Sequence, residues 1–164
     1  IRRMSAHRRS WAVIFADIDH FRHYNERHGH LGGDRALEEV ARILTGHVRP
    51  RDLIARFGGE EFCVLLPDTL AADAGEVAER LRRAVGEEST SLPEPVTVSI
   101  GVAVVGSGHT PMELAVVLAR ADQALYRAKL AGRNTVRIAG PDAETAADGA
   151  DGADRGAGLP RRPT

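Results

Sequence analysis

The chain has 164 residues, 43% of them hydrophobic, and a formal net charge of −1, values typical of one globular domain with no electrostatic preference for a polyanion. No apolar run approaches the ~20 residues that cross a bilayer, and the N-terminus has no signal-peptide pattern, so no membrane segment is expected. The single cysteine, Cys63, excludes an intramolecular disulfide and fits a reducing, cytoplasmic location.

The two ends of the chain differ in composition from its middle. Residues 1–10 are basic and are interpreted as the remnant of a leading helix, so we expect this chain to begin inside a longer protein. Residues 11–139 carry the periodic apolar pattern of a folded domain. Residues 140–164 hold almost no large apolar side chain, which predicts a disordered tail because burial cannot offset the ordering entropy.

The first element is a continuous apolar run over residues 11–16, which predicts a strand buried on both faces. It leads into Asp17 and Asp19, whose side chains lie on the same side of an alternating strand. A short polar helix over 21–28 and an amphipathic helix over 34–47 are expected next.

A hairpin follows, since residues 53–57 and 62–66 are short apolar strands separated by two glycines. Glycine reaches the positive φ angles that hairpin turns require. Across 56–62 the segment reads Arg-Phe-Gly-Gly-Glu-Glu-Phe, so the tip carries two adjacent glutamates. These carboxylates repel each other unless a cation lies beside them, and a metal ion is therefore the ligand to look for at this turn.

The remaining pattern predicts a third helix capped by Asp68 or Thr69 and a half-buried antiparallel strand over 96–104. A capping box over 110–113 opens a fourth helix, and a short strand over 135–138 closes the domain. This order predicts an α/β (α+β) fold with a mostly antiparallel central sheet flanked by helices. We expect the end of the first strand to lie beside the hairpin tip.

Four carboxylates from these two places, Asp17, Asp19, Glu60 and Glu61, form a candidate site for a hard cation. Magnesium takes oxygen ligands, commonly one or two carboxylates completed by water and substrate phosphates. Solvated turn carboxylates are the competing interpretation for either pair alone. Because both pairs adjoin apolar strands, the metal site is favoured.

No phosphate-binding glycine loop of the Walker or dinucleotide type is present. A nucleotide would therefore need side-chain cations, and Lys129, Arg133 and Arg22 are the candidates, although a basic pair at a helix end also compensates the helix dipole. The unevenly spaced histidines between residues 20 and 30 disfavour a zinc site. An aromatic content of 4% gives no support for a nucleic-acid polymer as partner.

Several spaced motifs resemble those of the GGDEF-domain diguanylate cyclases, in the GGEEF variant. Residues 56–62 match the family signature R-(Y/F)-G-G-(D/E)-E-F. The other matching segments are 15–22, which resembles F-x-D-I-D-x-F-K, 25–34, which resembles N-D-x-x-G-H-x-x-G-D, and the segments 98–102 and 121–134. The resemblance covers the chain from Trp11 to about Ile138.

The resemblance implies a palm-like fold, as in nucleotidyl cyclases and polymerases, with the hairpin at the active site. It implies an enzyme that condenses two GTP into cyclic di-GMP with release of pyrophosphate. Asp17, the backbone carbonyl of Ile18 and Glu60 would hold Mg²⁺ or Mn²⁺. Glu60 and Glu61 would be catalytic, with Glu61 assisting ligation or deprotonating the attacking 3′-hydroxyl.

The resemblance also implies the substrate ligands. Asn25 and Asp34 would bind guanine, whose N1–H and exocyclic amine are donors that a carboxylate accepts as a pair. The other residues expected to bind GTP are Arg22, Gly58, Gly59, Lys129 and Arg133. At position 22 the family usually has lysine, so here a planar fork replaces a point charge.

A second site is implied by the R-x-x-D pattern of Arg49 and Asp52, with Arg80 as a third contact. There the product cyclic di-GMP would bind and inhibit the enzyme. Ordinary charges around a proline turn are the competing interpretation, because the pattern is short.

The family pairs two domains for the reaction, so a homodimer is expected. The family's opening segment is absent here, which predicts an N-terminal sensor or regulatory domain in a larger, cytoplasmic or membrane-attached protein. Two other functions stay open. One is a non-catalytic receptor for GTP or cyclic di-GMP, against which the intact Asp17, Glu60 and Glu61 argue. The other is an enzyme making a different cyclic nucleotide.

Overall fold

The computed structural model describes residues 10–106 and 114–140. The basic segment over 1–9, the capping box over 110–113 and the tail beyond Gly140 lie outside the described residues, and the predictions made for them stay predictions. The described elements are β1 (Trp11–Ile18), α1 (Phe21–Gly46), β2 (Leu53–Arg56), β3 (Glu61–Pro67), α2 (Ala71–Glu88), the 3₁₀ helix η1 (Ser89–Ser91), β4 (Val98–Val105), α3 (Leu114–Leu130) and β5 (Val136–Ile138).

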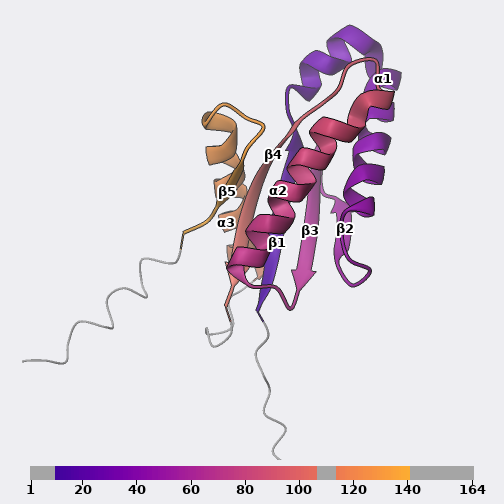
Figure 1. Ribbon diagram of the computed structural model, residues 1–164. Helices are drawn as coiled ribbons and strands as arrows, with labels where there is room; N and C mark the ends of the chain where they lie inside the picture. Colours follow the sequence, from indigo (N-terminus) through magenta and orange to yellow (C-terminus); the bar gives the residue numbers. More distant parts are fainter. Residues whose placement is uncertain (1–9, 107–113, 141–164) are drawn as a thin grey trace, which may run out of the picture.

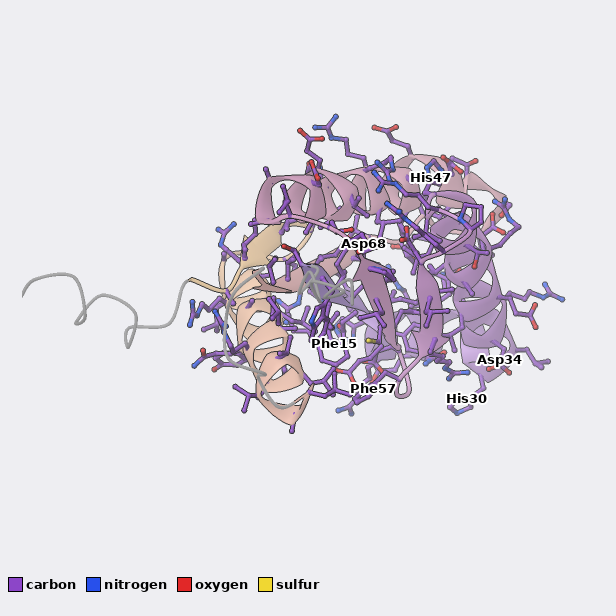
Figure 2. The ribbon with its side chains drawn as sticks, turned by 90° about the horizontal axis from the view of Figure 1, so that it is seen from below. Phe15, His30, Asp34, His47, Phe57 and Asp68 are labelled. Carbon is purple, nitrogen blue, oxygen red and sulfur yellow. The ribbon has the colours of Figure 1, made fainter. Side chains whose placement is uncertain are left out.

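The strands form one sheet in the order β2-β3-β1-β4-β5 (Figure 1). All neighbours pair antiparallel except β4 and β5, which are parallel, so the predicted mostly antiparallel sheet is confirmed. Helices α1 and α2 pack on one face and α3 covers β1 and β4 on the other (Figure 2). None of the helices within 10–106 and 114–140 combines the length and apolar character needed to cross a membrane.

Strand β1 lies in the middle of this sheet and is buried on both faces, as predicted. Ala12, Ile14 and Ala16 contribute to the core beneath α1 and α2. Val13 and Phe15 contribute to the smaller core beneath α3. A strand with two buried faces reads as a continuous apolar run, which is why the sequence predicted it.

Strand β4 is also buried on both faces, so the prediction of a half-buried strand was wrong. Its small residues looked like a solvent side, but they are where α3 packs closest. A Cβ added to Gly101 would lie 2.2 Å from both the carbonyl oxygen of Ala121 and the amide nitrogen of Leu125. Glycine is therefore required for α3 to approach the sheet at this distance.

Two smaller differences concern helix starts. Helix α1 is broken at Gly29, with φ 70° and ψ 171°, as predicted, but helical structure resumes directly after it rather than at Asp34. Helix α2 has Leu70 at its N-cap and no side-chain cap. The hydroxyl of Thr69 instead donates to the carbonyl of Pro67 (2.9 Å), so the predicted cap was wrong.

Candidate functional site

The end of β1 lies against the hairpin tip, as expected. The backbone N–H of Ile18 donates to the carbonyl of Glu60 at 3.2 Å. In the β1–β3 register Asp17 is directly opposite Glu61, so their side chains share a face. The structure thus brings Asp17, Glu60 and Glu61 to one edge of the sheet.

Lys129, in the last turn of α3, lies beside the end of β1. The ammonium of Lys129 lies 2.8 Å from Oδ2 of Asp17, whose side chain is 8% exposed. The pKa of Asp17 is raised above its usual value, first because burial disfavours the charged carboxylate. Lys129 and, more weakly, Arg133 act in the opposite direction, while the charge of Asp19 raises the pKa further.

Glu60 responds to the same surroundings. Its pKa is raised, first by burial and then by the negative charges of Asp17 and Glu61, with Lys129 opposing the shift. A carboxylate whose pKa is raised by burial and by a neighbouring negative charge is stabilised in its ionised form by a nearby cation. The arrangement therefore favours a cation between Asp17 and Glu60.

The donor set fits magnesium. Within the described ranges there is no cluster of three or more His, Cys, Asp or Glu side chains placed to hold a metal ion. The described side chains therefore cannot enclose a metal ion on their own. Two carboxylates completed by a backbone carbonyl, water and substrate phosphates is the usual arrangement for Mg²⁺, and Asp17, Ile18 and Glu60 can supply the protein's share.

Asp19 shares a side of β1 with Asp17, as predicted, but it does not join the carboxylate group. Its Oδ1 accepts from the hydroxyl of Ser99 at 2.6 Å. Its Oδ2 accepts from the hydroxyl of Thr97 at 2.7 Å and from the N–H of Asn134 at 2.9 Å. The expected group of four carboxylates is therefore not formed among the described residues, and Asp17 and Glu60 remain the candidate metal ligands.

The hairpin tip is shaped by hydrogen bonds rather than by left-handed glycines. Neither Gly58 nor Gly59 has a positive φ, so that prediction was wrong. The N–H of Phe57 donates to the carbonyl of Glu61 at 2.8 Å. The guanidinium of Arg56 donates to the carbonyls of Gly58 (3.3 Å) and Gly59 (2.7 and 3.1 Å). Arg56 therefore clamps the loop that carries Glu60.

The two glycines still have a steric reason to be glycine. A Cβ on Gly58 would lie 2.9 Å from Oε2 of Glu61, and the space beside Gly59 is open. The neighbouring Phe57 is 61% exposed, although it ends an apolar run. Its ring rests on Phe15, with centroids 4.9 Å apart (Figure 2).

A cleft of about 520 Å³ opens between α1 and the hairpin. This volume suits a nucleotide-sized ligand, since small-molecule sites span about 300–1,000 Å³. Figure 2 shows Asp34 and His30, which both line the cleft, projecting from α1 on the side of the molecule where the hairpin loop lies. The lining includes five residues predicted to bind GTP or metal, namely Arg22, Asn25, Asp34, Gly59 and Glu60.

Asn25 carries an unmet hydrogen-bonding capacity. Its Oδ1 is buried and has no partner among the described residues. Gly33 makes room for it, because a Cβ at that position would lie 1.8 Å from this oxygen. A buried acceptor without a partner is costly, so a ligand that donates to it is expected. Gly33 was not predicted as functional; its place directly before Asp34 was the available signal.

Of the other predicted cations, Arg22 lines the cleft and Arg133 follows the end of α3. Arg22 is exposed, and its Nε donates to Glu26 at 3.1 Å. Arg133 directly follows Gly132 beyond the end of α3, and its N–H donates to the carbonyl of Ala128 at 3.2 Å. Of the predicted phosphate ligands, Lys129 is thus the one in direct contact with a carboxylate of the site.

The residues of the predicted inhibitory site lie together on another part of the surface. The N–H of Arg49 donates to Oδ2 of Asp52 at 2.8 Å, and the N–H of Asp52 donates to the carbonyl of Arg49 at 2.9 Å. Arg80 donates to the carbonyl of His47 at 3.1 and 3.3 Å. Figure 2 places His47 on the α2 side, away from Asp34. Asp52 is 8% exposed, so it is a buried turn residue as well as a candidate ligand.

Comparison with known proteins identifies the family of this chain. The family described as "Diguanylate cyclase, GGDEF domain" matches residues 1–135. Response regulator PleD of Caulobacter vibrioides is 44% identical over 131 residues, which cover 76% of this chain and 28% of PleD. Diguanylate cyclase A of Treponema denticola is also 44% identical over 131 residues, covering 77% of this chain and 34% of that protein. The chain thus spans about a third or less of these two relatives.

Solved structures give the same result. The active GGEEF domain of a diguanylate cyclase from Vibrio cholerae superposes with a TM-score of 0.75 at 31% identity, covering 82% of this chain and 86% of that one. The GGDEF domain of DgcB from Caulobacter crescentus in complex with c-di-GMP gives a TM-score of 0.70 at 34% identity, covering 79% and 78%. The palm-like α/β fold expected from the sequence is confirmed.

Proposed function

The chain belongs to the GGDEF domain family of diguanylate cyclases, and on that basis we propose that it condenses two GTP molecules into cyclic di-GMP with release of two pyrophosphates. One observation carries the proposal. The end of β1, which carries Asp17, lies against the hairpin tip, which carries Glu60 and Glu61, and Glu60 lines a nucleotide-sized cleft. A non-catalytic binding module has no need of this carboxylate group.

We assign Mg²⁺, or Mn²⁺ in its place, to the carboxylates of Asp17 and Glu60 and the carbonyl of Ile18. When bound, the metal makes the 3′-hydroxyl a better nucleophile and neutralises charge on the leaving pyrophosphate. Glu61 is suited to accept the hydroxyl proton or to assist ligation, because it shares the face of Asp17. We assign Lys129, which pairs with Asp17, to the phosphates of GTP.

Guanine recognition is assigned to Asn25 and Asp34. The partnerless Oδ1 of Asn25 needs a donor, and the guanine edge supplies N1–H and an amine. Asp34 can accept both as a pair. Adenine has no N1–H, so the same cleft should reject ATP. Arg22, Gly58, Gly59 and Arg133 complete the proposed substrate contacts.

Each chain offers one such cleft, and the reaction consumes two GTP molecules. We therefore propose that two copies pair to react, which makes a homodimer the active form. The relatives' greater length supports a further regulatory domain in the full protein. GTP is a cytoplasmic substrate, which places the proposed reaction in the cytoplasm.

Product inhibition is assigned to Arg49, Asp52 and Arg80. The structure holds Arg80 next to the turn, through the carbonyl of His47. Oδ1 of Asp52 is buried without a partner among the described residues, and a guanine edge could supply the missing donor. Arginine forks suit both the phosphates and the guanine edge of cyclic di-GMP.

The test is the identity of the product. The domain is incubated at high concentration with GTP or ATP and Mg²⁺, and the nucleotides are separated by chromatography and weighed by mass spectrometry. Cyclic di-GMP from GTP alone supports the proposal. A mononucleotide product would favour a different cyclase, and unchanged GTP that nevertheless binds the domain would favour the receptor.

A further inference from the structure

Asp19 connects three segments that are distant in the sequence. Its carboxylate accepts from Thr97 and Ser99, at the start of β4, and from the backbone of Asn134, after α3. The residue itself follows β1 and is 7% exposed. A carboxylate accepting three hydrogen bonds is held firmly, and in a buried setting each of them is valuable.

The segment that Asp19 holds has an unusual backbone. Gly132, Arg133 and Asn134 have φ angles of 105°, 64° and 42°. Left-handed conformations are costly for residues with a side chain and persist only where the surroundings enforce them. Two hydrogen bonds hold Asn134 in this conformation. Its backbone N–H donates to Asp19, and its side-chain Oδ1 accepts from Arg82 at 2.7 Å.

This turn lies next to two cations in the chain. It contains Arg133 and directly follows the helical turn that carries Lys129. Lys129 bonds to Asp17, and the charge of Arg133 is close enough to lower the pKa of Asp17 against the larger effect of burial. A turn that relaxed to right-handed geometry would move Arg133 and loosen the last turn of α3.

We propose that Asp19 is a positioning residue, which holds the left-handed turn 132–134 and so places Lys129 and Arg133 for the β- and γ-phosphates of GTP. The inference deepens the proposed function and rests on it, since it concerns the triphosphate of the same substrate. It assigns Asp19 no contact with metal, because both its oxygens already accept hydrogen bonds from the protein.

The test compares GTP with GMP, which lacks the two outer phosphates. Dissociation constants with Mg²⁺ are measured by calorimetry for the wild type, Asp19→Ala and Asp19→Asn. The alanine variant should bind GTP about tenfold more weakly, the effect of one charge-assisted bond, and GMP unchanged. The asparagine variant should bind both like the wild type, because its amide oxygen accepts from Thr97 and Asn134 and its amide nitrogen donates to the Ser99 hydroxyl.

Two results would overturn the inference. If Asp19→Asn loses GTP binding as fully as Asp19→Ala, the charge of Asp19 acts directly on metal or phosphate. If Asp19→Ala keeps its GTP affinity, the turn does not need Asp19. A wild type that binds neither nucleotide contradicts the proposed function itself, and this inference with it.

A second pair of variants covers the case in which Asp19→Ala does not fold, as judged by circular dichroism. Asn134 is exposed, so substitution leaves the core intact. Asn134→Gly tolerates φ 42°, whereas a β-branched valine does not. Asn134→Val should bind GTP about tenfold more weakly than Asn134→Gly does, and the two variants should bind GMP with equal affinity. Equal GTP affinities would count against a required left-handed turn.

Discussion

The ammonium of Lys129 lies 2.8 Å from the carboxylate of Asp17, where β1 meets the hairpin tip. The pair joins residues from opposite ends of the domain and is possible because Gly101 lets α3 pack close against the sheet. A half-buried ion pair contributes little net stability, since desolvation offsets the attraction. Despite Lys129, the pKa of Asp17 remains raised, first by burial. The carboxylate group is therefore a cost to the fold that function explains.

The first prediction concerns Asp17→Asn, which keeps the shape and removes the charge. Because folding raises the pKa of Asp17, the folded state is favoured below the unfolded-state pKa, and that advantage is lost as the pH rises through the folded-state pKa. The variant should therefore melt a few degrees higher than the wild type at pH 7, with the difference shrinking towards acidic pH. Thermal unfolding at several pH values measures this.

The same variant should lose activity. Loss of an outer partner of a metal ligand already costs about 10- to 100-fold, so loss of the ligand itself should lower cyclic di-GMP formation by at least about 100-fold. Gln123→Ala, an exposed change on α3, is the control and should alter neither property. An Asp17→Asn protein that is less stable at pH 7 would show that the ion pair outweighs burial.

The second prediction concerns Gly33→Ala. The added Cβ would lie 1.8 Å from Oδ1 of Asn25, so the amide must leave its place in the cleft. The KM for GTP should rise about tenfold, the loss of one hydrogen bond to guanine, with a smaller change in kcat. Gly86→Ala on α2 is the matched control, because its Cβ would meet nothing within 4 Å. A normal KM in Gly33→Ala would remove Asn25 from guanine recognition.

The third prediction concerns Arg56→Ala. Without its bonds to the carbonyls of Gly58 and Gly59, the hairpin loop should exchange its amide hydrogens faster and hold Glu60 less well. A misplacement of about 1 Å can cost about 100-fold, so a fall in kcat of up to that size is expected. Arg137→Ala, on the opposite edge of the sheet, should leave both measurements unchanged. Fast exchange with full kcat would mean that the clamp is dispensable.

The fourth prediction separates the two residues of the R-x-x-D pattern. Arg49 is exposed, so Arg49→Ala should weaken inhibition by cyclic di-GMP about tenfold or more without changing the melting temperature. Asp52 is buried and bonded to the N–H of Arg49, so Asp52→Ala should also lose about 1 kcal/mol of stability. Arg51→Ala serves as the control. Inhibition that is equal in the wild type and Arg49→Ala would remove this site.

Local sequence patterns predicted much of the fold, because the residues that determine a single strand, helix break or turn are neighbours in the sequence. The continuous apolar run gave β1, and the glycines at 29 and 58–59 marked a helix break and a hairpin. The same patterns failed where packing decides. Alternation in β4 suggested a solvent face, but Gly101 and Ala103 are small because α3 covers them. Turn chemistry failed at Gly58 and Gly59, whose loop is held by Arg56 instead of by positive φ.

The candidate site was predictable in its members but not in its contacts. The family resemblance named Asp17, Glu60, Asn25 and Asp34, and the structure lines the cleft with the last three and sets Asp17 beside the hairpin. No sequence pattern could show that the carboxylate of Asp19 accepts hydrogen bonds from within the protein, because its partners come from the start of β4 and from the turn after α3. Such long-range hydrogen bonds depend on the finished topology.

The most direct test of the proposed reaction compares cyclic di-GMP formation by the wild type and Glu61→Ala, side by side, with GTP and Mg²⁺ at high protein concentration. Glu61 is the partly buried first residue of β3, faces Asp17 across the β1–β3 ladder and belongs to neither hydrophobic core, so its truncation leaves the core intact. We expect cyclic di-GMP from the wild type and a loss of product in the variant. No dinucleotide from the wild type, or equal product from both proteins, would contradict it.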